Sequence, residues 1–188
     1  MVGYLPETLN IGDMEYEINT DFRACLSILN AFGDPELTNE DKVQVMLTIL
    51  FGEGNLSKIN DYSEACRKAI WFLNCGKDMK DDAEESALSP TMDWEQDELL
   101  IFSGIATTIG RDIRMDPVCH YWAFMSYFLG MGECTFTVIR SIRRKISKHQ
   151  KLEKWEQDFY RENRKIVEIK KEAEMKERLF EEVFGVTK

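Results

Sequence analysis

The run Val118–Met131, VCHYWAFMSYFLGM, constrains the fold more than any other feature because it contains no Lys, Arg, Asp or Glu. On a helix its side chains form two lines. One line holds Tyr121, Phe124, Met125 and Phe128, and the other holds Trp122, Ser126 and Leu129. A helix that is apolar nearly all round is usually buried by its neighbours. We therefore predict a central helix in a helical core, with part of its surface able to receive an apolar partner helix.

This run is too short to span a membrane, and so is every other apolar run in the chain. A membrane helix needs about 20 consecutive apolar residues. Residues Met1–Pro6 have neither the basic region nor the apolar run of a signal peptide. The five cysteines are irregularly spaced and form no CxxC pair, so no disulfide framework is expected. These features favour a reducing cytoplasm as the location.

The first part of the chain predicts a hairpin followed by three helices. Residues 8–18 alternate apolar and polar side chains around Gly12, a position free to adopt a positive φ. The next segments have apolar residues at helical spacing, with capping residues before them and glycines after them. Their predicted starts are Asn19–Asp21, Thr38 and Asp61, and their predicted ends are Gly33, Gly52 with Gly54, and Gly76.

The rest of the chain predicts an acidic mobile loop over about 77–92 and then further helices. These helices begin near Asp93, at Pro117 in the first turn of the aromatic run, and near Thr135. Residues 150–184 contain no Gly or Pro and alternate acids with bases, which predicts a long, charged C-terminal helix. The expected fold is mainly α: a helical domain over 1–149 with an N-terminal β-hairpin, and the charged helix over 150–188.

Charge is distributed unevenly along the chain. Residues 1–138 carry 9 basic and 24 acidic side chains, whereas residues 139–188 carry 15 basic and 10 acidic ones. The basic residues are concentrated in one run: Arg140, Arg143, Arg144, Lys145, Lys148 and Lys151. This run could be a solvated helix face, a contact for nucleic-acid phosphates, or a contact for an acidic protein or the chain's own acidic half. It lacks interleaved exposed aromatic residues, and the formal net charge of −10 disfavours nucleic acid.

No pattern in the sequence points to catalysis. Cys119, His120 and Cys134 could supply zinc ligands, but zinc sites draw three or four ligands from paired motifs, and no second pair exists. Adjacent residues on a helix point about 100° apart, so Cys119 and His120 are not expected to act as nucleophile and base. Acid pairs such as Asp81-Asp82 lie in the acidic loop, and no phosphate-binding glycine loop is present. We expect no catalytic residue, no metal and no cofactor.

An ordered set of motifs resembles the bacteriophage gene-product-fifteen family, found in tailed phages and prophages of Gram-positive bacteria. The set begins with Ile18–Arg23 after a short hairpin. It continues with Trp94 and Asp97, Asp112-Ile113, His120-Tyr121-Trp122 with Phe124, Gly130-Met131, Thr135 with Thr137, Arg143, and Phe159-Tyr160. The resemblance covers about residues 8–165, which is most of the chain.

The resemblance implies a tail-cluster protein that looks like a tail assembly chaperone. Such a protein would be non-enzymatic and would act in the cytoplasm of the bacterial host on the tape measure protein and the tail tube protein. Association of this chain with copies of itself is a further alternative. The residues expected to define the family or to bind partners are Trp94, Trp122, Phe124, Arg140, Arg143 and Arg144. The alternative function is that of a nucleic-acid-binding or packaging accessory protein that uses the basic helix 140–151. A salt titration with Arg143, Arg144 and Lys145 neutralised would separate the two.

Overall fold

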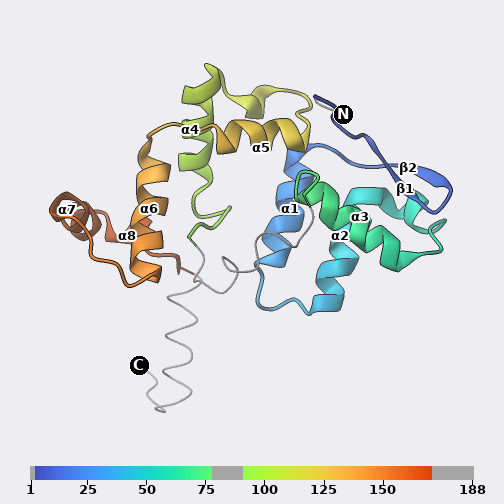
Figure 1. Ribbon diagram of the computed structural model, residues 1–188, viewed down its shortest axis with the longest axis horizontal. Coiled ribbons are helices and arrows are strands. Elements are labelled where there is room, and N and C mark those ends of the chain that lie inside the picture. Colours follow the sequence, from blue (N-terminus) through green and yellow to red (C-terminus); the bar gives the residue numbers. More distant parts are fainter. Residues whose placement is uncertain (1–2, 78–90, 171–188) are drawn as a thin grey trace, which may run out of the picture. The chain divides into compact units, whose positions relative to one another are not determined.

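The computed structural model describes residues 3–77 and 91–170, and this part of the chain is mainly helical with one antiparallel pair of strands (Figure 1). The predicted fold class is therefore confirmed. The elements are β1 (Thr8–Ile11), β2 (Met14–Glu17), α1 (Phe22–Phe32), α2 (Asn39–Leu56), α3 (Tyr62–Leu73), α4 (Glu98–Ile109), the 3-10 turn η2 (Ile113–Met115), α5 (Tyr121–Leu129), α6 (Thr135–Ser147), α7 (Lys154–Glu162) and α8 (Arg164–Val167).

The chain divides into two compact units that are interleaved in sequence. Unit 1 comprises residues 1–86 and 109–130, and unit 2 comprises residues 87–108 and 131–188. Unit 1 contains the hairpin with α1, α2, α3 and α5, whereas unit 2 contains α4, α6, α7 and α8. The α7 and α8 segments therefore belong with α6.

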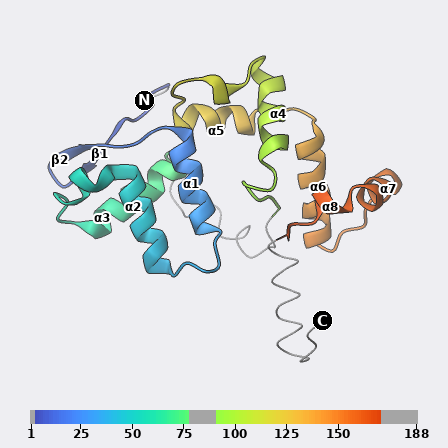
Figure 2. The ribbon, with the colours of Figure 1, turned by 180° about the vertical axis from the view of Figure 1, so that it is seen from behind.

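The hairpin in unit 1 forms where the alternating pattern predicts it. Leu9 pairs with Tyr16 and Ile11 with Met14 across a two-residue turn, in which Gly12 has φ 58°. Leu9, Ile11 and Tyr16 are buried, so one face of the hairpin packs on the helices (Figure 2). The Tyr16 hydroxyl donates to the Lys58 carbonyl at 3.2 Å. Two strands are marginal alone, and this packing on α2 and α3 supplies the missing apolar contact.

The first three helices begin at the predicted capping residues. The Asp21 side chain accepts from the Arg23 amide, Thr38 and Asp41 form a reciprocal capping box, and the Asp61 side chain accepts from the Glu64 amide. The helix breaks at Gly52 as predicted, but a further helical segment follows and reaches Leu56, so Gly54 does not end it. Gly52 has φ 71° and produces a kink, after which Leu56 returns to the core.

Helix α5 places only one of its two apolar lines in the core. Tyr121, Phe124 and Phe128 are buried, whereas Trp122 is partly buried and Leu129 is 69% exposed. The helix begins at Tyr121 with His120 as its cap, so the prediction that Pro117 lies in its first turn was wrong. The segment before His120 instead forms the short turn η2 and an extended stretch around Asp116.

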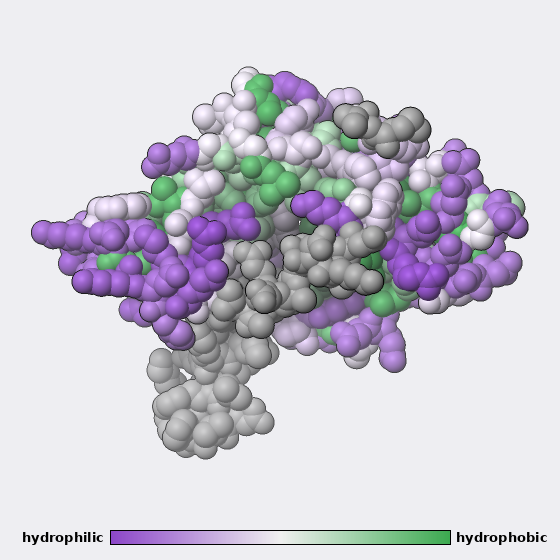
Figure 3. Space-filling model, in the orientation of Figure 1, coloured by the Kyte–Doolittle hydropathy of each residue, from purple (hydrophilic) through white to green (hydrophobic). Residues whose placement is uncertain are grey.

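Unit 2 is built around α6. Ile139 and Ile142 of α6 form a core with Val167, and Leu100, Val138, Leu152, Phe159 and Tyr160 pack against it. In Figure 3 the surface over α7 is mostly hydrophilic, whereas hydrophobic atoms gather over α4. No helix within residues 3–77 and 91–170 is long and apolar enough to cross a membrane.

The C-terminal helix predicted from residue 150 is not continuous over its described part. Helix α7 starts at Lys154 and ends at Glu162, α8 is a single turn, and Glu168 is extended with ψ 133°. The chain bends because Val167 and Ile169 are buried in unit 2, which a straight exposed helix would not allow. The rest of the predicted helix, from residue 171, and the centre of the predicted acidic loop, residues 78–90, lie outside the described residues.

Candidate functional site

The six residues predicted from the sequence are divided between the two units. Trp122 and Phe124 lie on α5 in unit 1, whereas Trp94 and the three arginines lie in unit 2. Trp94 is partly buried in the turn before α4. Arg143 is buried, and Arg140 and Arg144 are exposed on the same helix.

In unit 1, the beginnings of α1 and α5 pair through their main chains, and we call Thr20–Arg23 with Cys119–Trp122 the helix-start junction. The Phe22 amide donates to the Cys119 carbonyl at 2.9 Å, and the Tyr121 amide donates to the Thr20 carbonyl at 2.7 Å. The Asp21 carboxylate caps α1 and also accepts from the Cys119 amide at 3.3 Å. One carboxylate thus fixes both helix starts.

Two further side chains secure this junction. The Arg23 guanidinium donates to the carbonyls of Arg114 and Asp116, at 3.0 and 2.9 Å. His120 Nδ1 accepts from the Trp122 amide at 3.0 Å and caps α5. His120 Nε2 lies 3.0 Å from the Pro6 carbonyl, which can only accept, so Nε2 carries the proton. Both ring nitrogens of His120 are therefore used inside the protein.

The two aromatic residues singled out on α5 serve the core of unit 1. The Phe124 ring is stacked on Phe22, with centroids 4.8 Å apart and planes 6° apart. Trp122 is partly buried, contacts Trp71 edge-on, and donates its indole N–H to the Phe72 carbonyl at 2.8 Å. An indole N–H that finds a carbonyl in this way is the usual arrangement for a buried Trp. Any contact of Phe124 with a partner would require unit 1 to open.

The thiols in unit 1 are held in their neutral form. Burial, with the negative charge of Asp21 and the nearby Cys75 thiol adding to it, raises the pKa of Cys25 to about 12. Burial is also the main cause of the raised pKa of Cys119, to which Asp116 and Asp21 contribute. Thiolates are the reactive form of cysteine, so these positions are not activated. Within the described residues no group of three or more His, Cys, Asp or Glu side chains could hold a metal ion.

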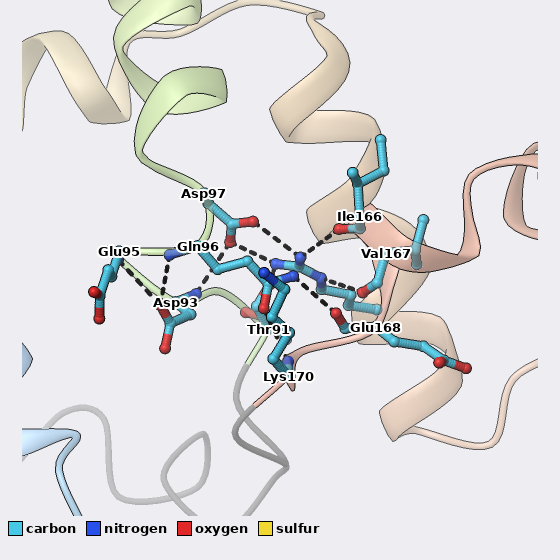
Figure 4. Close-up of polar contacts among 10 residues, drawn as sticks. Thr91, Asp93, Glu95, Gln96, Asp97, Ile166, Val167, Glu168 and Lys170 are labelled. Atoms are coloured by element: carbon cyan, nitrogen blue, oxygen red, sulfur yellow. Dashed lines mark hydrogen bonds and ion pairs between the residues drawn. The ribbon is translucent and has the colours of Figure 1, made fainter. Parts of the chain in front are cut away.

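The most completely built polar cluster in unit 2 surrounds Arg143. Its Nη1 and Nη2 donate to the two carboxylate oxygens of Asp97 at 2.5 and 2.9 Å, and both side chains are buried. Nε and Nη2 also donate to the carbonyls of Val167 and Ile166, at 2.6 and 2.8 Å, and Nη1 reaches the Thr91 carbonyl at 3.4 Å. Figure 4 shows these groups converging on one guanidinium, which uses every N–H it has.

Gln96 completes the cluster by binding the main chain of residues 168–170. Its side-chain amide donates to the Glu168 carbonyl at 2.8 Å, and its side-chain oxygen accepts from the Lys170 amide at 2.9 Å (Figure 4). These two bonds resemble those that a neighbouring strand would make. The Arg143 cluster therefore fixes the last described residues of the chain against α6 and the start of α4.

The exposed cations of α6 form a separate feature, which we call the basic stripe: Arg140, Arg144 and Lys148. They recur every four residues on the side of α6 opposite Ile139 and Ile142. In the described part of the chain no ion pair involves them, whereas Lys145 is paired with the buried Glu156 at 2.6 Å. Trp155 is 56% exposed just beyond the predicted basic run, so an exposed aromatic residue does follow it.

Several large apolar side chains are exposed in each unit. In unit 1 the most exposed are Met115 at 84%, Leu129 at 69% and Val118 at 67%, and in unit 2 Leu99 is 74% exposed. Met115 and Val118 flank Asp116, whose carbonyl is held by Arg23. Exposed apolar residues are normal when single, but a fixed segment that presents two of them can bind an apolar partner.

Sequence reasoning missed the roles of Asp97 and Gln96. Asp97 lies directly before α4, in which Glu98 is the only charged residue, and a buried acid needs a buried base. A single acid beside an apolar helix is visible in the sequence. Its partner, Arg143, lies 46 residues away and could not be identified from local spacing.

A family model described as bacteriophage Gp15 protein matches residues 1–169 of the chain. No curated protein and no solved structure matches it. The match ends at Ile169, the last buried residue of unit 2 among those described.

Proposed function

Because this chain belongs to the bacteriophage Gp15 protein family, with a role in phage structure or assembly, we propose that it is a non-enzymatic, chaperone-like tail assembly protein. It acts in the host cytoplasm and binds the tape measure protein, and also the tail tube protein, during tail morphogenesis. The observation that carries the proposal is the family match over residues 1–169.

The chemistry of the surface supports a chaperone-like role. A tape measure protein is a long helical chain whose apolar seams would aggregate if they stayed exposed. This chain combines exposed apolar residues such as Met115 and Val118 with a formal net charge of −10. Apolar contacts would cover a client seam, and the net charge would keep the complex in solution.

A non-enzymatic role is supported by how the polar groups are used. The carboxylates of Asp21 and Asp97 and the two nitrogens of His120 all bind partners within the fold. Burial keeps the thiols of Cys25 and Cys119 protonated by raising their pKa values. These acids, this histidine and these thiols therefore have roles in stabilising the fold, which supports a function without catalysis.

Co-expression with the tape measure protein tests the proposal. We expect the soluble fraction of the tape measure protein to rise several-fold with the wild-type chain. The Met115→Lys/Val118→Lys variant should lose most of this gain, because two charges would have to enter an apolar contact. The matched control, Gln44→Lys/Asn60→Lys, adds the same charge at exposed polar positions and should behave as wild type. If the tape measure protein were equally insoluble with and without the wild-type chain, the proposal would fail.

The second candidate function, nucleic-acid binding or packaging, is favoured by the basic stripe and the exposed Trp155. If it is correct, binding to DNA should weaken as salt rises. Neutralising two phosphate contacts with Arg140→Gln/Arg144→Gln should then lower the slope of log K against log [salt] by about 2. The control Lys58→Gln/Lys77→Gln removes two exposed cations elsewhere and should leave the slope unchanged. An equal slope for wild type and both variants would exclude the basic stripe as a phosphate contact.

The structure also corrects the variant suggested by the sequence. Neutralising Arg143 would break the buried pair with Asp97, and neutralising Lys145 would leave the buried Glu156 without its partner. A loss of DNA binding in that variant would not distinguish a lost phosphate contact of Arg144 from unfolding of unit 2, so the exposed Arg140 and Arg144 are the informative positions.

A further inference from the structure

Helix α6 ends in an unusual way. The Gln150 amide donates to the Lys145 carbonyl at 2.8 Å and the His149 amide donates to the Ile146 carbonyl at 3.0 Å, which closes the helix in the manner of a Schellman motif. The residue that turns the chain is His149, with φ 52°. That position is normally Gly, because a side chain in the left-handed region is strained.

The local sequence does not favour a turn at this point. Residues 133–184 contain no Gly and no Pro. The connection between α6 and α7, residues 148–153, which we call the hinge, consists mostly of good helix formers such as Lys, Gln, Leu and Glu. Ser147 Oγ, beside the hinge, is buried and has no hydrogen-bond partner in the described part of the chain. The turn is therefore imposed by packing against the preferences of the hinge.

That packing comes from residues 154–170, which we call the arm. Glu156 of the arm pairs with Lys145, and the carbonyls of Ile166 and Val167 accept from Arg143. Gln96 binds the main chain of residues 168–170, and Val167 and Ile169 are buried. All these contacts join the arm to α6 and the start of α4. An identical arm from another molecule could make every one of them.

We propose that two copies of this chain exchange their arms and form a domain-swapped dimer. In the dimer α6, the hinge and α7 form one continuous helix, and each arm occupies the other copy's unit 2. The exchange keeps the contacts with Lys145, Arg143 and Gln96 and releases the strain at two hinges, one in each chain. The partner is a second copy because the surface already fits this arm. The inference is independent of the proposed client.

The first test changes only His149. Purified full-length protein is refolded at high concentration, and its mass is measured by size-exclusion chromatography with light scattering. We expect wild type to contain dimer that exchanges slowly with monomer. His149→Gly should raise the dimer dissociation constant by about tenfold or more, because Gly tolerates the closed turn and disfavours the continuous helix. His149→Ala, a better helix former, should lower it by about tenfold. Absence of dimer, or equal masses for the three proteins, would overturn the proposal.

The second test separates arm exchange from association through a surface. In a monomer whose arm packs on its own α6, Lys145→Glu places the new acid beside Glu156. Glu156→Lys places the new base beside Lys145. When the two variants are refolded as a mixture, a swapped heterodimer unites opposite charges at both sites. We expect heterodimer well above the statistical half, measured by native mass spectrometry. Random pairing of the two variants would show that the arms are not exchanged.

Discussion

Replacing Arg143 with methionine is expected to lower the free energy of unfolding by about 3–5 kcal/mol, the usual cost of breaking a buried ion pair on one side. The substitution leaves the Asp97 carboxylate, 1% exposed, without its cation. It also removes the donors to the carbonyls of Val167 and Ile166, so the end of the described chain loses its hydrogen bonds to α6. Urea denaturation followed by circular dichroism measures the change, with an intermediate expected if unit 2 unfolds before unit 1.

Two variants show whether the buried pair is the cause. Arg144→Met, one residue along on the exposed side of α6, should change stability by about 0.5 kcal/mol or less. The double variant Asp97→Leu/Arg143→Met should recover part of the loss, because no charge is then buried unpaired. Full recovery is not expected, because the main-chain carbonyls still lack donors. If Arg143→Met and Arg144→Met cost the same, Arg143 would not hold unit 2 together.

The elements of this fold were predictable where the signal is local. Gly12 within an alternating run and caps at Asp21, Thr38 and Asp61 identified the hairpin and the first three helix starts, and the structure places them there. Such signals act within one turn of a helix or across one hairpin, so they need no knowledge of the rest of the chain. Gly52 was identified as a break, but the helical segment that follows it to Leu56 was not predicted, because a glycine can kink a helix as well as end it.

The Arg143 cluster and the helix-start junction depend on contacts between residues far apart in the sequence, which local spacing does not reveal. Arg143 was grouped with its basic neighbours, yet it lies on the buried side of α6 and pairs with an acid 46 residues away. Asp21 was predicted as a cap, but its second bond reaches an amide 98 residues away. The break between α6 and α7 is a similar case: nothing in residues 148–153 favours it, and it is stabilised by later residues, through the burial of Val167 and Ile169 and the pairing of Glu156 with Lys145.

Replacing Phe124 with alanine is expected to lower the free energy of unfolding by about 3–5 kcal/mol, the range for large core aromatics. The ring is fully buried and stacked on Phe22, which follows the cap of α1. Its loss leaves a cavity beside the helix-start junction, which the main-chain bonds between Cys119 and Phe22 prevent from collapsing. Thermal and urea unfolding measure the effect.

The control, Leu129→Ala, removes an apolar side chain from the end of the same helix, where it is 69% exposed. It should change the free energy of unfolding by about 0.5 kcal/mol or less. A larger loss for Phe124→Ala than for Leu129→Ala then shows that burial of the side chain, and not its place in α5, causes the effect. The pair also distinguishes core from contact surface. Folded Phe124→Ala protein should retain wild-type affinity for a client, because the Phe124 ring does not reach the surface. A Phe124→Ala variant that kept full stability but lost client binding would place that ring at an interface and contradict the assignment of Phe124 to the core.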